Sequence, residues 1–356
     1  MSFSWLLMVA AFNAARPRYI AVTTNVVNGH AGMIPCVRRC MKDFPSVDNG
    51  LMAARLIHRR REIKRMFRRL LSTIAVLALS ACQAHGPAVA VTDPPRNAAY
   101  PARSQVLHIP SGGLEINGLA YLASGQGSHP TLVICHGWPG NEKNLDLAQA
   151  VRRAGWNAIT FNYRGSWGSP GEFHFSQVPE DAAAVLAWLR KPDVAAKLGV
   201  DTNHMTLAGH SMGGWATAIT AASDSSLLGA ILVAPADMGS FGKQPRAALV
   251  KITSGNTETL VNTSAEKMAD ELTAQADSFS LIATAPGLVK LPLLVLTSDD
   301  GLAPRANALV AAIREQGGKS VQTQHFATDH VWSDSRIALE EKVIAWLKEL
   351  PGAPTR

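Results

Sequence analysis

The feature that most constrains the fold is the alternation of apolar runs with helix-length segments after residue 130. Strand-like runs occupy residues 131–137, 157–163, 204–211, 229–236, 291–300 and 320–326. Amphipathic segments separate most of these runs, and another closes the chain at 336–350. Continuous apolar strands connected by helices indicate a parallel sheet covered on both faces. We therefore expect an α/β fold with its ligand site at the carboxyl ends of the strands.

Two parts of the chain depart from this alternation. Residues 106–110 and 116–124 resemble an opening hairpin, so the sheet is expected to be mostly parallel. More than fifty residues separate the sixth and seventh strands, about twice what a single return helix needs. We expect two or three helices there, forming a small cap at about 238–288 within one folded domain at 104–350.

The positive charge is concentrated near the N-terminus. The formal net charge is +7, but residues 1–81 hold 13 Lys+Arg and 3 Asp+Glu, against 21 and 24 in residues 82–356. A basic total can indicate nucleic acid or a membrane surface as partner. The basic run at 59–69 has poor helical spacing and few interleaved aromatic residues for base stacking. We therefore expect no nucleic-acid partner.

Residues 66–85, MFRRLLSTIAVLALSACQAH, read like the start of an exported protein. A short positive segment at 66–69 precedes an apolar stretch at 70–80, which is shorter than the ~20 residues of a membrane span. The sequence LSAC at 79–82 resembles the bacterial lipobox, in which the cysteine takes lipid. The resemblance implies a lipoprotein signal peptide at 66–81 and lipidation of Cys82, whose several acyl chains would give stable anchoring.

This interpretation predicts a protein of the bacterial cell envelope, anchored to the membrane by lipid and facing the periplasm. Two alternatives stay open: a buried core helix with an incidental cysteine, and cleavage after Ala90 to give a soluble periplasmic protein. Residues 82–103 are rich in Ala and Pro, the composition of an extended tether. Residues 1–65 would then be a non-native extension from an overlong gene model, or disordered.

A candidate nucleophile lies in the sequence GHSMG at 209–213, which follows a strand and precedes a helix. In that context G-x-S-x-G places a serine on a sharp, strained turn, with glycine on either side to relieve crowding. Gly209 and Gly213 would serve this purpose, and Ser211 would project its hydroxyl beside the helix N-terminus.

Serine needs a base, and the base needs a carboxylate to fix its tautomer. Among eleven histidines, His330 is the predicted base because it lies in a loop just after the last strand. His325 is the alternative within that strand, whereas His136 and His210 are expected to hold loops. Asp300, after the preceding apolar strand, is the predicted acid; the competing candidates are Asp299 and Asp237.

A tetrahedral intermediate needs donors for its oxyanion. The N–H of Met212, beside the nucleophile, is one predicted donor. The loop HGWPG at 136–140 offers another, the N–H of Trp138, with Gly137 supporting the turn. No metal-ligand cluster, phosphate loop or dinucleotide fingerprint occurs after residue 82, so we expect no cofactor and no metal.

From about residue 106 onward the chain resembles an α/β-hydrolase. HGWPG, GHSMGG, SDDGLAP at 298–304 and the DH at 329–330 occur in that family's order, and NYRGSWGSPGEF at 162–173 resembles the loop after its fourth strand. The resemblance is greatest to the acylaminoacyl-peptidase and dienelactone-hydrolase-like esterase branch. It implies acyl transfer to water through an acyl-enzyme intermediate.

Three functions are therefore weighed. The first is a serine hydrolase of carboxylic esters, acting on a small-molecule acyl ester. The second is an acyl- or dipeptidyl-type peptidase with a peptide-like substrate, in which acids of the cap would hold an ammonium group. The cap acids of this second hypothesis are Asp270, Glu271 and Asp277. The third function is that of a non-catalytic envelope lipoprotein. No oligomeric state is predicted. Residues predicted either to line an apolar pocket or to pack in the core are Trp138, Trp167, Met212, Trp215, Met238 and Trp332.

Overall fold

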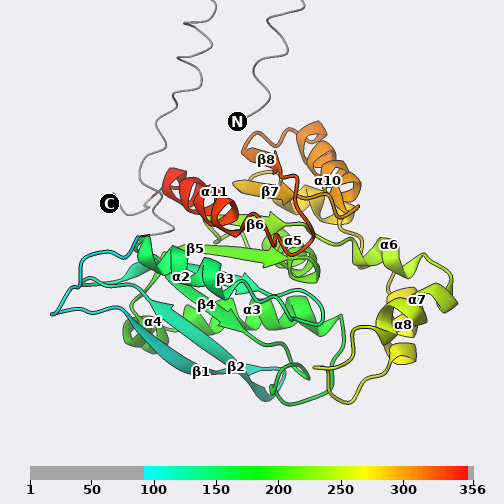
Figure 1. Ribbon diagram of the computed structural model, residues 1–356, viewed down its shortest axis with the longest axis horizontal. Helices are drawn as coiled ribbons and strands as arrows, with labels where there is room; N and C mark the ends of the chain where they lie inside the picture. Colours follow the sequence, from blue (N-terminus) through cyan, green and yellow to red (C-terminus); the bar gives the residue numbers. More distant parts are fainter. Residues whose placement is uncertain (1–91, 352–356) are drawn as a thin grey trace, which may run out of the picture. The chain divides into compact units, whose positions relative to one another are not determined.

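The computed structural model describes residues 92–351 (Figure 1). The predicted signal peptide, Cys82, the alternative cleavage site and the first part of the tether lie outside the described residues. Within 92–351, no helix combines the length and apolar character needed to cross a membrane.

One eight-stranded sheet forms the centre of the described part, in the order β1-β2-β4-β3-β5-β6-β7-β8. β1 and β2 form an antiparallel hairpin, β2 pairs antiparallel with β4, and β3 to β8 pair in parallel. The prediction of a mostly parallel sheet opened by a hairpin is confirmed. The strands are β1 Arg103–Ser111, β2 Leu114–Leu122, β3 His129–Cys135, β4 Asn157–Phe161, β5 Val200–His210, β6 Gly229–Val233, β7 Leu293–Thr297 and β8 Val321–His325.

Helices cover both faces of the sheet, as the apolar strands require. β3, β4, β6 and β7 are buried along their whole length, whereas the edge strand β8 is polar and mostly exposed. A polar edge strand discourages pairing with another chain. The helices between and after the strands are α2 Leu145–Arg153, α3 Gln177–Leu189, α4 Pro192–Leu198, α5 Met212–Ser223, α10 Ala303–Glu315 and α11 Arg336–Glu349.

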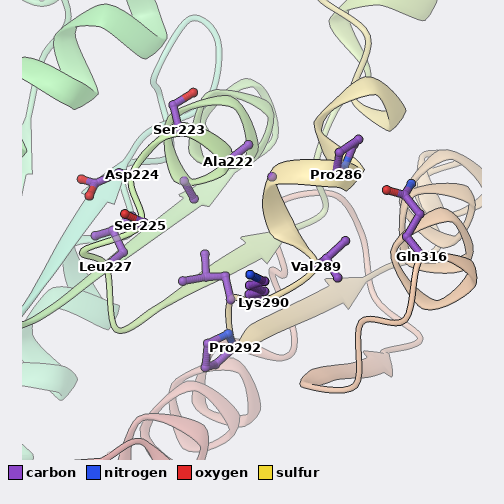
Figure 2. Close-up of a pocket in the computed structure, with 13 residues that line it drawn as sticks. Ala222, Ser223, Asp224, Ser225, Leu227, Pro286, Val289, Lys290, Pro292 and Gln316 are labelled. Carbon is purple, nitrogen blue, oxygen red and sulfur yellow. The ribbon is translucent and has the colours of Figure 1, made fainter.

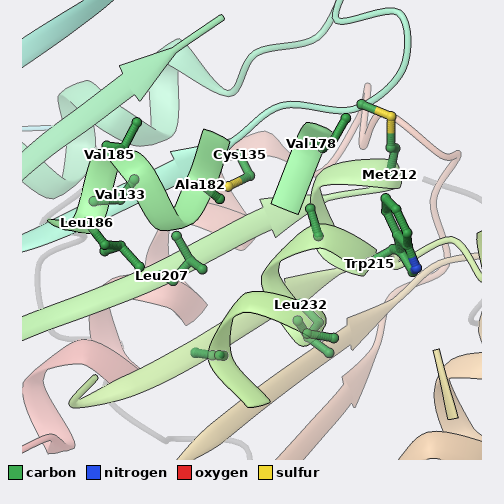
Figure 3. Close-up of a cluster of buried hydrophobic side chains, with 14 of the residues drawn as sticks. Val133, Cys135, Val178, Ala182, Val185, Leu186, Leu207, Met212, Trp215 and Leu232 are labelled. Carbon is green, nitrogen blue, oxygen red and sulfur yellow. The ribbon is translucent and has the colours of Figure 1, made fainter. Parts of the chain in front are cut away.

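The core has two layers because successive strand residues point to opposite faces. Leu207 and Leu232 belong to the cluster beneath α3 and α5 (Figure 3), whereas their neighbours Ala208 and Val233 belong to the cluster beneath α2 and α11. Both clusters are completed by side chains from the covering helices, such as Trp215 of α5. The sheet is thereby a rigid platform for the loops at its carboxyl edge.

The connection between β6 and β7 contains more helices than expected. Four α-helices and one 3₁₀-helix lie in residues 238–288, and α6, α7 and α8 stand together beside the sheet (Figure 1). The sequence predicts two or three because α6, η2 and α9 are too short to show a helical period. The elements are α6 Met238–Gly242, α7 Arg246–Ser254, α8 Ala265–Ala274, η2 Ile282–Thr284 and α9 Ala285–Leu288.

This cap is fixed to the body of the domain. Leu249, Met268 and Leu272 of the cap are buried in the same cluster as the residues of α3 and α5. The Nε1–H of Trp215 donates to the Phe279 carbonyl at 2.8 Å, so a polar contact joins α5 to the cap as well.

Candidate active site

Ser211 is the single residue between β5, which ends at His210, and α5, which begins at Met212. Its backbone has φ 57° and ψ −121°, a conformation that costs a non-glycine residue about 1–3 kcal/mol. Two backbone hydrogen bonds hold it there: the Ser211 N–H donates to Val233 O, and the Ala236 N–H donates to Ser211 O, both at 3.0 Å. The strained turn presents the hydroxyl at the carboxyl edge of the sheet.

Glycine is needed on both sides of this turn because backbone groups approach closely. A Cβ on Gly209 would overlap the Gly213 carbonyl, and a Cβ on Gly213 would overlap the Cys135 carbonyl. The side chains that these two residues lack would therefore push α5 away from β3 and β5.

His330 joins Ser211 to a carboxylate. Its Nε2 lies 2.9 Å from the Ser211 Oγ, and its Nδ1 lies 2.7 Å from the Asp300 Oδ2. Since the Nδ1–H donates to the carboxylate, the Nε2 of the neutral ring is free to accept the serine proton. Asp300 also accepts from the Leu302 N–H at 2.9 Å, which fixes its carboxylate. The three residues predicted as a triad are thus brought into hydrogen-bond contact.

The competing candidates for acid and base have other partners. The His325 Nε2 lies 3.0 Å from Asp299 Oδ1 and its Nδ1 lies 2.9 Å from the Thr297 hydroxyl. Asp237 caps α6 by accepting from the Ser240 N–H, and it also accepts from the Leu281 N–H. Neither carboxylate contacts His330.

Two buried histidines hold the loops around Ser211. The Nε2–H of His210 donates to the His330 carbonyl at 2.8 Å, and the two rings lie 4.7 Å apart. The Nδ1–H of His136 donates to the Gly137 carbonyl at 2.7 Å. Burial lowers the pKa of His136 to about 4 and that of His210 to about 3, so both rings are neutral near pH 7.

The loop at 136–140 lies against the nucleophile. A Cβ added to Gly137 would be 3.1 Å from the Ser211 Cβ. Because a trans peptide group is planar, the His136 bond to the Gly137 carbonyl also sets the opposite direction of the Trp138 N–H. Met212 is the first residue of α5, so its N–H has no acceptor within the helix. These are the two predicted oxyanion donors.

A comparison with known protein families identifies the family of this chain. The sequence profile described as the alpha/beta hydrolase family matches residues 132–340. The chain belongs to the alpha/beta hydrolase family. Its matched region includes every residue of the Ser211, Asp300 and His330 arrangement.

Two curated relatives of this chain are uncharacterized. One, from Mycobacterium tuberculosis, is 27% identical over 121 residues, which is 34% of this chain and 41% of that protein. The other, a 31.7 kDa Escherichia coli protein from the traX-finO intergenic region, is 27% identical over 165 residues, 43% of this chain and 56% of that protein. The alignments thus cover less than two thirds of either relative.

Solved structures share the fold at low sequence identity. An esterase from Pyrobaculum calidifontis is 19% identical with a TM-score of 0.53, covering 70% of this chain and 87% of that one. An acylaminoacyl peptidase from Pyrococcus horikoshii is 17% identical with a TM-score of 0.54, covering 72% and 43%. The predicted α/β-hydrolase fold is therefore confirmed.

A small pocket opens at Ser211. It is a half-open cleft of about 180 Å³, lined by residues 137–142 of the loop after β3 together with His210 and His330. Asn256 of the cap and Val331 complete its wall. The sequence does not single out Asn256, because only the folded connection brings the cap segment back to the loop, whereas Val331 directly follows the predicted base His330.

Of the six apolar residues predicted for either a pocket or the core, Trp138 lines this pocket and the other five do not. Trp215, Met238 and Trp332 are buried, and Trp332 packs against Phe326. Trp167 lies behind the loop, where its Nε1–H donates to the Pro139 carbonyl at 2.8 Å. Trp215, Met238 and Trp332 thus pack in the core, and Trp167 makes a polar contact with the loop.

The acids of the cap are also engaged elsewhere. Asp270 pairs with Arg246 at 2.6 Å, and Asp277 pairs with Lys243 at 2.9 Å. Glu271 accepts the backbone N–H groups of residues 175 and 176, both at 2.9 Å. None of the three lines the pocket at Ser211.

A larger pocket, of about 620 Å³, lies at the amino ends of β6 and β7 (Figure 2). Its walls come from the end of α5, from residues 286–292 before β7 and from Gln316. Among its polar members, Asp224 already accepts from Arg190 at 2.7 Å. This pocket has the larger volume, but the pocket at Ser211 is the candidate active site because it contains a nucleophile and a base held by an acid.

Proposed function

We propose that this protein is a serine hydrolase that cleaves carboxylic esters through an acyl-enzyme intermediate. The observation that carries the proposal is the position of His330, which lies 2.9 Å from the Ser211 Oγ and 2.7 Å from Asp300. A hydroxyl that contacts an imidazole, which in turn contacts a carboxylate, is an activated nucleophile.

In the proposed acylation, His330 Nε2 takes the proton of Ser211 as the Oγ attacks the ester carbonyl carbon. The N–H groups of Trp138 and Met212 stabilise the negative oxygen of the tetrahedral intermediate. The carbon–oxygen bond to the alcohol then breaks, and His330 gives its proton to the leaving alkoxide. Asp300 stabilises the imidazolium while this proton is held.

Water reverses these steps in deacylation. His330 takes a proton from water as its oxygen attacks the acyl carbon, and the Ser211 oxygen leaves with the proton returned by His330. The free carboxylic acid and the original serine result. Besides the ester and water, these steps use side chains and backbone donors of this chain.

The contacts of the site favour esters over peptides with a free amino terminus. Each of the three cap acids that could hold an ammonium group is engaged with another group, as described above. The pocket at Ser211, about 180 Å³, is only slightly larger than a cavity of about 150 Å³ that takes benzene. We therefore propose short or benzene-sized acyl groups.

Hydrolysis of p-nitrophenyl esters from acetate to decanoate, alongside the matching anilides, tests the proposal. Native protein should cleave acetate to butyrate esters at least about tenfold faster than decanoate and than any anilide. Ser211→Ala should remove this activity. Cleavage of anilides as fast as esters by the native protein would favour the peptidase function. If the folded protein cleaves neither class of substrate, this result would favour a binding function.

For its location we propose lipid attachment at Cys82, on the strength of the LSAC sequence at 79–82. Cells fed an alkyne-labelled fatty acid should incorporate the label into native protein, and Cys82→Ser should prevent it. Label in the variant, or none in the native protein, would contradict the anchor and leave cleavage after Ala90 to be tested by N-terminal sequencing.

A further inference from the structure

The geometry points to Trp167 and Thr259 as positioning residues for the oxyanion hole, acting through the carbonyl of Pro139. This inference rests on the proposed hydrolase function. The Pro139 oxygen accepts from the Trp167 Nε1–H at 2.8 Å and from the Thr259 hydroxyl at 3.2 Å. A carbonyl has two lone pairs, so both are used and the direction of this peptide group is fixed.

Pro139 directly follows Trp138, the predicted oxyanion donor. The proline ring restricts its own φ, and the double contact to its carbonyl fixes its ψ, so the backbone of the residue after Trp138 is held. On the other side, the His136 ring holds the Gly137 carbonyl. The peptide group before Trp138 is thereby held by His136, and the peptide group after Pro139 is held by Trp167 and Thr259.

The close contact between the indole and the loop requires glycine at position 140. Gly140 has φ 103°, and an added Cβ would lie 2.7 Å from Trp167 Nε1 and 2.6 Å from His136 Nδ1. The two rings therefore enclose this residue. A side chain here would displace the indole from the carbonyl that it binds.

Trp167 itself is held in an unfavourable conformation by several contacts. It has φ 48°, which a bulky residue rarely adopts. Its N–H donates to Thr259 O at 3.0 Å, and its carbonyl accepts from the Asn162 Nδ2–H at 3.2 Å. The Lys143 Nζ lies 3.9 Å from the centre of its ring. Strain persists where surrounding contacts over-determine it, often next to a functional site.

Thr259 brings the cap into the same arrangement. The cap segment at 259–261 pairs with the loop at 165–173: the Val261 N–H donates to Gly165 O at 2.8 Å, and the Phe173 N–H donates to Val261 O at 3.1 Å. Three segments far apart in the chain thus meet at one carbonyl. The folded cap completes the support of the oxyanion donor as well as the pocket wall.

The test uses variants that remove one donor and little volume. Trp167→Phe keeps a ring under Lys143 but has no N–H, and Thr259→Val has no hydroxyl. Thr259→Ser retains the hydroxyl. Two controls make the same substitutions at other positions. Trp188→Phe changes a tryptophan on α3, and Thr257→Val changes a threonine of the same cap segment. Among the described residues, no hydrogen bond to the Thr257 hydroxyl is present.

We expect kcat for a butyrate ester to fall about 10- to 100-fold in Trp167→Phe and about 3- to 10-fold in Thr259→Val, with KM within about twofold. The Ki of a trifluoromethyl ketone with the same acyl chain, whose adduct occupies the oxyanion hole, should rise in step with the loss of kcat/KM. Thr259→Ser and both controls should stay within about twofold of native protein.

Active native protein with unchanged kcat and Ki in Trp167→Phe and Thr259→Val would overturn this inference and leave the proposed function intact. A lower melting temperature with an unchanged Ki would also overturn it, since that result describes packing alone. A folded native protein that hydrolyses no ester overturns the proposed function, and this inference with it.

Discussion

Two aspartate–histidine pairs lie side by side at the ends of β7 and β8, and only one of them reaches Ser211. The Asp300 Oδ2 lies 2.7 Å from the His330 Nδ1, and the Asp299 Oδ1 lies 3.0 Å from the His325 Nε2, so the pairs are nearly equal in distance. They differ in exposure: the Asp300 side chain is 4% exposed, against 63% for Asp299.

This comparison shows what distinguishes a site from a surface contact. An exposed ion pair is screened by water and contributes little to stability. The buried carboxylate of Asp300 is instead fixed by the Leu302 N–H and has the His330 imidazole as its ionisable partner. Burial, a second donor and contact of the histidine with Ser211 set one pair apart, although adjacent residues supply both acids.

The largest expected difference between the pairs concerns the bases. His330→Ala should lower kcat/KM for a short ester by about 10⁴- to 10⁶-fold, because Ser211 loses the group that takes its proton. The same change at His325 should alter kcat/KM by less than about twofold. Steady-state hydrolysis of p-nitrophenyl butyrate measures both; equal losses would show that the two pairs are not functionally distinct.

The acids provide the next comparison. Asp300→Asn should lower kcat by about 10⁴-fold, since an amide can hold the imidazole in the wrong tautomer and cannot stabilise its charge. Asp299→Asn should remain within about twofold of native protein. The same kinetic assay, with melting temperatures to show that both variants fold, checks this expectation. A large loss in Asp299→Asn would instead make Asp299 the acid.

A smaller effect should follow from loosening the loop of His330. His210→Asn removes the donor to the His330 carbonyl, so kcat should fall by about tenfold, roughly the worth of one hydrogen bond. His204→Asn, at a partly buried contact with Asp201 on β5, is the control and should leave kcat unchanged. A native kcat in His210→Asn would mean that the loop holds its position unaided.

The smallest effect concerns the dependence of stability on pH. Burial lowers the pKa of His210 to about 3 and that of His136 to about 4, whereas both titrate near 6.5 in an unfolded chain. Between about pH 6.5 and pH 4 the unfolded state therefore binds more protons, so stability falls as pH falls through this range. Above about pH 6.5 both states hold neutral rings and this contribution is flat.

Urea unfolding at pH 7.5, 6.5, 5.5 and 4.5 measures this dependence. Carboxylates also titrate at the acidic end, so the comparison is between native protein and His210→Asn. The variant should lose less stability than native protein on acidification. Identical slopes would contradict a buried neutral His210.

Much of this architecture follows from local pattern. Apolar runs of strand length mark β3 to β7 because these strands are buried on both faces, and the family's motifs lie in the turns that follow them. The contact of Ser211 with His330 could be predicted because parallel strands bring their carboxyl ends to one edge.

What the sequence could not predict depends on contacts between distant segments. Nothing local marks Thr259 or Asn256, since each gains its place only when the cap folds back onto the loop at 136–140. The apolar character of Trp215 and Trp332 is compatible with a pocket or a core, and only packing decides between them. The number of cap helices was underestimated for the related reason that short helices have no visible period.

The account depends most directly on Ser211 being an activated nucleophile. The decisive measurement is the reaction of folded protein with a fluorophosphonate, followed by intact mass and peptide mapping. One adduct per chain, located on Ser211, absent in Ser211→Ala and strongly slowed in His330→Ala, is the predicted result. Folded native protein that takes up no label, or label that persists in Ser211→Ala, would contradict the account.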